Sequence, residues 1–397
     1  MGGDWVGAAA TALSAWLVLV ASSVALAATM ISGDTSARGL LILTGSLVGA
    51  AFGGDTSLSA AGLQWSIGVY PLTLTCLTLV AAGWVFRRRL LAVGVGPDVR
   101  PELRGLLGAG LQAVRVGLVF VVLMVGSTLV LRGSVPDGAS SLRLSVSPGL
   151  PAALGSLLLT LACLSVVLVV HRASLPAQVR TVIRWVAIPA KAIGVAFLGA
   201  SVLTLIGGLV AIGVADLDDQ RVVVASLIGC LPNVTLVVLY MGMGAALQVG
   251  GSGGELFTDT FGVVAAKVHV TTLTNEVSAW YWLIPVLTTL TVLAIAVLVV
   301  WFSRDGGLAR SNLLRTVALA VLAAPFVTHL ASLHTHLSGG IAENVRGMLG
   351  VDWPEALGLS LLWFIGAAVV GSALVPTILE RRAAPVRTPP QPGQVMS

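Results

Sequence analysis

Charged residues are scarce in this chain: Asp, Glu, Lys and Arg together make up only 10% of its 397 residues. The remainder is strongly apolar, with 56% hydrophobic residues and a mean hydropathy of +0.98. A soluble globule of this length cannot bury so much apolar surface, which excludes that class of protein. The chain is therefore expected to lie in a lipid bilayer.

Acidic residues and lysine are also missing from the middle of the long apolar runs. This absence argues against a proton-coupled transporter that uses a carboxylate at the bilayer midplane. The sequence has no GxxxxGK[ST], HExxH or GxSxG motif and no pair of intramembrane carboxylates. We therefore expect a protein that is not an enzyme, with no catalytic residue and no cofactor. The three cysteines lie in apolar runs and do not indicate a disulfide framework.

Eight apolar runs are long enough to cross the hydrocarbon core, which needs about 20 helical residues. They are residues 5–31, 62–86, 112–131, 151–170, 190–214, 281–302, 312–333 and 354–375. The runs lack the alternation of a membrane barrel, so the predicted fold is all-α, a polytopic transmembrane helical bundle. The first run contains "SSVALAAT", which resembles a signal-peptide cleavage site, but the absence of Lys and Arg before it favours a retained helix.

Two further apolar segments, residues 40–52 and 222–247, are predicted to be re-entrant or interfacial on the outer side. The first is too short to span comfortably, and the second carries Pro232 near its middle, where proline removes a backbone donor. Counting the second segment as a crossing would also place the basic cluster from Arg304 to Arg315 outside.

Basic residues predict the orientation, because Lys and Arg near helix ends are retained in the cytoplasm. Most of the 22 basic residues follow the second, fourth, sixth and eighth runs, as in Arg87-Arg88-Arg89 and Arg381-Arg382. Both termini are therefore predicted to be cytoplasmic. The net charge of +5 is explained by these topology signals, and the expected partner is the lipid bilayer rather than nucleic acid.

The chain has four helical hairpins in tandem, at residues 1–89, 104–172, 191–304 and 312–382. In each one an outer segment with strand-like alternation precedes an apolar run with a basic end. The predicted organisation is a first membrane half at 1–172, a cytoplasmic linker at 173–190, a second half at 191–382 and a disordered Pro-rich tail at 383–397. All hairpins have the same orientation, so the repetition is parallel.

Glycine is frequent in the two extra apolar segments. Gly45, Gly49 and Gly53 recur every fourth residue, a spacing that lets helix backbones approach closely in a membrane. Gly242 and Gly244 lie in the second segment. Ordinary helix packing and the lining of a path for a small solute or lipid are both open interpretations.

Pro232, Asn233 and Thr235 interrupt the second segment. A carrier without buried charges could bind its substrate there through backbone carbonyls and hydroxyls. The alternative is that Asn233 is a cap or turn residue.

His329, His334 and His336 form a cluster at the outer end of the seventh run. A metal site would need converging imidazoles with a carboxylate such as Glu343 or Asp352, and these spacings do not place all three on one helical face. Local hydrogen bonding is the main interpretation, with metal binding or pH sensing as the alternative. Glu355, just after Pro354, is expected to favour the start of a helix.

Three stretches, "PLTLTCLTLVAAGWVFRRRL", "LPNVTLVVLYMGMGAALQVGGS" and "GVDWPEALGLSLLWFIGAAVVGSALV", resemble the streptophobe family of actinobacterial polytopic membrane proteins. The resemblance extends more loosely to membrane proteins linked to the cell envelope and cell division. It implies a bacterial inner-membrane location and supplies no catalytic residues.

Two functional classes follow from the sequence. The first is a permease or channel-like protein for a small solute or lipid, indicated by the repeats and the broken Gly-rich segments. The second is a non-enzymatic membrane scaffold or envelope-assembly partner, indicated by the lack of buried ionisable residues. A membrane-protein partner or a homo-oligomer is compatible with either class.

Overall fold

The computed structural model describes residues 4–30, 37–54, 56–60, 63–68, 70–92, 103–130, 133–137, 140–146, 149–171, 175–215, 219–252, 265–276, 278–303, 306–339 and 342–383. The helices are α1 (Trp5–Met30), α2 (Ala37–Ala50), α3 (Leu72–Ala92), α4 (Leu103–Val130), α5 (Gly149–Val170), α6 (Ala177–Val214), α7 (Gln220–Gly229), α8 (Leu231–Met243), α10 (Val270–Glu276), the 3-10 turn η1 (Ala279–Trp282), α11 (Leu283–Phe302), α12 (Gly306–Ala331) and α13 (Trp353–Ala383). The strands are β1 (Thr56–Ala60), β2 (Leu63–Gly68), β3 (Gly133–Asp137), β4 (Ser140–Val146), β5 (Leu247–Ser252), β6 (Ala265–Val268), β7 (Leu333–Gly339) and β8 (Ala342–Val351).

Among the described residues, seven helices are long and apolar enough to cross a membrane. They are α1, α4, α5, α6, α11 (continuous with η1), α12 and α13. The predicted polytopic helical bundle is confirmed, and the chain is a multi-pass membrane protein. The prediction that the helix at 62–86 begins at residue 62 is wrong. Residues 63–68 form β2, and α3 begins only after Pro71, whose fixed φ suits a helix start. α3 carries three arginines near its end and is not among the seven.

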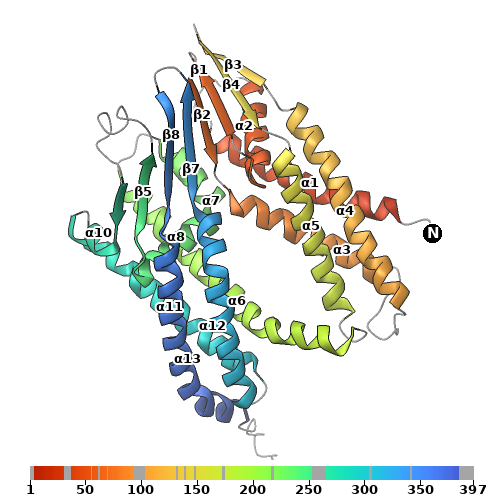
Figure 1. The fold of residues 1–397 in the computed structure, drawn as a ribbon, viewed down its shortest axis with the longest axis vertical. Helices are drawn as coiled ribbons and strands as arrows, with labels where there is room; N and C mark the ends of the chain where they lie inside the picture. Colours follow the sequence, from red (N-terminus) through yellow and green to blue (C-terminus); the bar gives the residue numbers. More distant parts are fainter. Residues whose placement is uncertain are drawn as a thin grey trace, which may run out of the picture.

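Each helical hairpin carries a β-hairpin at the same end of the bundle (Figure 1). The eight strands pair antiparallel into one sheet in the order β3-β4-β1-β2-β7-β8-β5-β6. We call this end of the bundle the sheet side. The alternating outer segments of the sequence are therefore strands of a shared sheet added to the helical bundle.

The strand order repeats between the two halves of the chain. The first half contributes β3-β4-β1-β2 and the second contributes β7-β8-β5-β6, so that in each half the later hairpin comes first. β2 and β7 join the halves, from Gln64 opposite Ser338 to Gly68 opposite His334. The same order in both halves is the arrangement of a parallel repeat.

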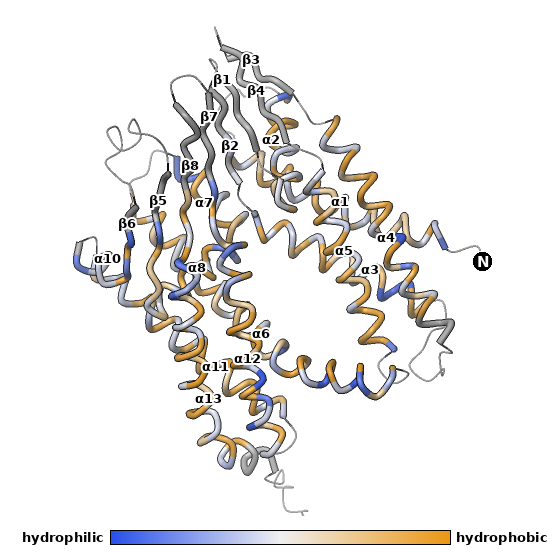
Figure 2. The backbone as a smooth tube through the Cα atoms, in the orientation of Figure 1, coloured by the Kyte–Doolittle hydropathy of each residue, from blue (hydrophilic) through white to orange (hydrophobic). Residues whose placement is uncertain are grey.

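Two apolar cores lie beneath the sheet. One is formed mainly by α1 to α5 around Phe120 and Leu159, and the other by α6, α8 and α11 to α13 around Val299 and Ala356. Figure 2 shows hydrophobic residues along both bundles and hydrophilic residues near the helix ends. The two bundles meet mainly at the sheet side, where α7 packs on α1 and α3 and α8 packs on α3.

α7 and α8 form a bent pair with an angle of 81° at Cys230. α7 follows the sheet-side end of α6, and α8 leads into β5, so both ends of the pair lie on the sheet side. This geometry is that of a broken span or a re-entrant segment, and the expectation that 222–247 is re-entrant or interfacial stays a prediction. The bend lies just before the expected turn, because Pro232 occupies the first turn of α8, where its missing donor costs nothing.

Most of the predicted linker at 173–190 belongs to α6, which begins at Ala177 and contains Pro189. Proline at an internal helix position bends a helix rather than always ending it, which explains the difference. The predicted disordered tail lies outside the described residues except for Ala383.

Candidate functional site

One face of the sheet carries apolar residues in both halves. A row of successive Cα partners runs from β4 through β1, β2 and β7 to β8: Leu144, Leu58, Trp65, Leu337 and Val345. Residues four apart on a strand return to the same face. A second row on this face therefore runs from β7 to β6: Leu333, Leu349, Val249 and Ala266. We call these two rows the apolar face.

The alternate register positions include a polar row, although Met348 on β8, the partner of His334, is apolar. The row between them runs from β4 to β5: Ser145, Ser57, Ser66, His336, Arg346 and Ser252. Apolar surface on a sheet is stable where lipid, protein or a ligand excludes water from it. Leu349, in the second half, has an exposed fraction of 40%.

Two strands of the sheet, β7 and β8, are attached to spanning helices by a single residue. α12 ends at Ala331 and β7 begins at Leu333, while β8 ends at Val351 and α13 begins at Trp353. β7 and β8 therefore adjoin two apolar helices directly.

Asn233 lies beneath the sheet at the junction of the two halves. Its Oδ1 accepts a hydrogen bond from the Leu72 backbone N–H at 3.2 Å, and its Nδ2 donates to the Leu330 carbonyl at 3.1 Å. These two backbone groups belong to the first turn of α3 and the last turn of α12, which have no partners within their own helices. Asn233 therefore caps one helix from each half. The structure places it in a buried position with both its amide oxygen and its amide nitrogen hydrogen-bonded.

The other residues of the predicted pathway pack within α8 and against α11. Thr235 is fully buried and donates to the carbonyl of Leu231 in its own helix at 2.8 Å. A Cβ on Gly242 would lie 2.0 Å from Thr288 Oγ1, so glycine permits the close approach of α8 to α11. Gly244 ends α8 with a φ of +107°, a conformation that favours glycine.

Gly45 and Gly49 are buried within α2. Gly53 lies beyond the helix end with a φ of +85°, and the Gly54 N–H donates to the Gly49 carbonyl at 3.0 Å. Gly53 therefore belongs to the turn that ends α2, whereas Gly45 and Gly49 lie where the helix packs.

The histidine cluster is divided between α12 and β7. The rings of His329 and His334 have their centroids 5.4 Å apart, and Ser332 Oγ lies 2.7 Å from His334 Nε2. His336 is a register partner of Ser66 and Arg346 in the polar row. Within the described ranges, no group of three or more His, Cys, Asp or Glu residues could hold a metal ion.

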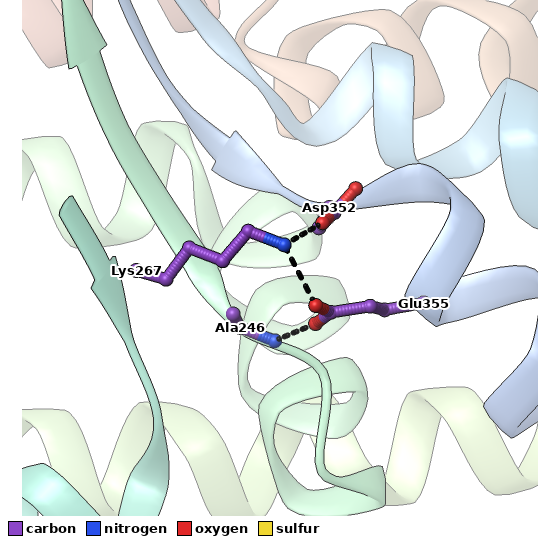
Figure 3. Close-up of polar contacts among 4 residues, drawn as sticks. All are labelled: Ala246, Lys267, Asp352 and Glu355. Atoms are coloured by element: carbon purple, nitrogen blue, oxygen red, sulfur yellow. Dashed lines mark hydrogen bonds and ion pairs between the residues drawn. The ribbon is translucent and has the colours of Figure 1, made fainter. Parts of the chain in front are cut away.

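An ion cluster connects edge strand β6 to the start of α13 (Figure 3). Lys267 Nζ lies 2.5 Å from Asp352 Oδ2 and 2.8 Å from Glu355 Oε1. Glu355 Oε2 accepts a hydrogen bond from the Ala246 N–H at 2.9 Å, which ties β5 to the same point. Sequence reasoning assigned Glu355 only to the helix start, because no local pattern pairs it with a lysine 88 residues away.

Replacing Lys267 with methionine is expected to loosen β6 from α13, because Asp352 is mostly buried and would lose its cation. Hydrogen exchange of β5 and β6 should then become faster, whereas Lys267→Arg should retain slow exchange.

Hydrogen bonds to Asp352 and Glu355 raise the pKa of Lys267 to about 12. From neutral pH up to the ordinary lysine pKa of about 10.4 its stabilising effect should therefore be constant, and it should be lost as the pH rises through about 12. If β5 and β6 exchanged hydrogen equally fast in Lys267→Met and in the parent, Lys267 would not hold β6 to α13.

Comparisons of the chain with protein-family models, with curated proteins and with solved structures return no match.

Proposed function

We propose that this integral membrane protein is a permease for a lipid-like amphiphile, which passes between the bilayer and the apolar face of the sheet. The observation that carries the proposal is the register: apolar positions of strands from both halves share one face, and two of these strands, β7 and β8, adjoin the spanning helices α12 and α13. An acyl chain is matched by such a surface, since the favourable term is apolar area removed from water.

The arrangement of the two bundles supports lipid rather than a polar solute. The bundles pack on each other at the sheet side, through α7 and α8, and have separate cores. Asn233, which a polar substrate would need, already holds two backbone groups through its amide oxygen and its amide nitrogen. A lipid needs an apolar route beside the helices and no polar channel through them.

The remaining features of the proposal follow from the sequence. The protein is non-enzymatic, lies in a bacterial inner membrane with both termini in the cytoplasm, and is related to the streptophobe family. With this orientation the sheet lies outside the cytoplasm, and the basic helix ends lie inside.

The test is reconstitution into liposomes that contain a phospholipid with a photoactivatable diazirine in its acyl chain. Illumination and peptide mapping should label the apolar-face strands as well as the spanning helices. Leu58→Asp should reduce labelling of the sheet at least about tenfold, because a charge on this face is costly to keep from water. Ser59→Asp, the next residue on β1 and on the opposite face, is the matched control and should label as the parent does. Labelling confined to the helices would contradict the proposal.

The second candidate is a membrane scaffold whose apolar face is covered by a partner protein. The junction around the buried Asn233 favours it, because this side chain binds backbone groups of one helix from each half. In this case liposomes that contain the chain alone should transfer a fluorescent phospholipid no faster than protein-free liposomes.

A further inference from the structure

The first part of α6 has no buried residue. Residues 177–188 are exposed or half-buried, and Pro189 is the first buried position. Apolar side chains are among the exposed ones, with exposed fractions of 62% for Val182 and 44% for Trp185. Figure 1 shows this part of α6 running across the bundle, from the end of α5 toward the second half. We call residues 177–188 the connecting helix.

The connecting helix is amphipathic. Arg180 and Arg184 are four residues apart and share one face. Val179, Val182 and Val186 follow each other at spacings of three and four residues and lie on the opposite face. Figure 2 shows this alternation of hydrophilic and hydrophobic positions along the start of α6. A helix with an exposed apolar stripe and a basic stripe is suited to lie in the plane of a membrane surface.

The position of the connecting helix agrees with this orientation. It begins at the end of the bundle opposite the sheet, where α5 leaves the bilayer, and Pro189 marks the change to the spanning part of the same helix. Trp185 lies 5.4 Å from the guanidinium of Arg315 on α12, which places an aromatic ring at the level of a basic helix end. Tryptophan is favoured at the boundary between headgroups and acyl chains.

We propose that the connecting helix is a binding surface for anionic phospholipid headgroups in the leaflet opposite the sheet. Val179, Val182 and Val186 enter the acyl region, and Arg180 and Arg184 contact the phosphates. Charge complementarity identifies the occupant, because this segment carries two arginines and no acidic residue. Each basic side chain near such a surface strengthens binding about fivefold, so that the pair contributes roughly 30-fold.

The test uses the full chain, without its three native cysteines, in nanodiscs that contain phosphatidylglycerol. Nitroxide labels are placed one at a time on the apolar stripe, at Val182 and Val186, and beside the arginines, at Ala177 and Ala187. Ala177 and Ala187 lie three or seven residues from each arginine and leave both charges in place. The labels at Val182 and Val186 should collide readily with oxygen and poorly with a water-soluble nickel chelate, and those at Ala177 and Ala187 should show the reverse.

The role of charge is tested by replacing phosphatidylglycerol with phosphatidylcholine. In the parent, the label at Val182 should then lie less deeply in the bilayer. In the Arg180→Gln, Arg184→Gln double variant, the depth of this label should be the same in both lipids. Arg221→Gln, on α7, should behave as the parent. Equally high accessibility to the nickel chelate at all four positions would overturn the proposal, since it would show that the helix lies in water. The same depth in both lipids for the parent would overturn the assignment to anionic headgroups.

Discussion

Replacing Asn233 with leucine is expected to lower the free energy of unfolding by about 2–4 kcal/mol. Two partly buried backbone groups, the N–H of Leu72 and the carbonyl of Leu330, would lose their side-chain partners at once. Each unsatisfied buried group costs about 1–3 kcal/mol. The measurement is the urea or thermal unfolding midpoint of the detergent-solubilised chain, together with hydrogen exchange at the start of α3 and the end of α12.

Thr235→Val is the matched control for this substitution. Thr235 lies two residues away and is equally buried, but its hydroxyl bonds only to the Leu231 carbonyl of the same helix. The loss should be below about 1 kcal/mol, because that carbonyl keeps its place in the helix. If Asn233→Leu were no more destabilising than Thr235→Val, Asn233 would not connect the two halves.

Gly242→Val is the second substitution with a large expected effect. A Cβ at this position would lie 2.0 Å from Thr288 Oγ1 and 2.8 Å from the Ile284 carbonyl oxygen, and backbone cannot move aside as a flexible side chain does. Overpacking of this kind costs about 1–3 kcal/mol for a few added atoms and more when the backbone must shift. α8 should separate from α11, which a lower unfolding midpoint and faster exchange in α8 would report.

Gly199→Ala in α6 is the control for Gly242. Nothing lies within 4 Å of a Cβ built at Gly199, so this substitution adds a methyl group to open space. It should be neutral or stabilise the helix by up to about 1 kcal/mol. A similar loss in both variants would show that glycine at 242 is not required by the contact with α11.

The helical bundle could be predicted because each spanning helix is encoded locally, by about 20 apolar residues and a basic end. The strand-like alternation of the outer segments was also visible, but their assembly into one sheet was not. Pairing such as that of Trp65 with Leu337 joins residues far apart in the chain, and no local pattern specifies it. The same reason explains why the cluster of Lys267, Asp352 and Glu355 was missed.

The role of Asn233 could not be predicted from its position in the sequence alone. Its position after Pro232 indicated either a substrate site or a cap, and both fit a break in an apolar helix. The structure adds the partners, which come from α3 and α12. A cap for two distant helices has no signature within the segment itself, since its partners are backbone groups.

The central claim is that the two halves share one sheet, and cross-linking at the β2–β7 junction tests it most directly. In the full chain without native cysteines, Ser66→Cys is combined either with His336→Cys on β7 or, as a control, with Ser57→Cys on β1. Both are its register partners. Mild oxidation in membranes should form the 66–336 bond about as readily as the 57–66 bond, as mapped by proteolysis and mass spectrometry. Formation of the 57–66 bond without the 66–336 bond would show that the halves carry separate hairpins and would contradict the account.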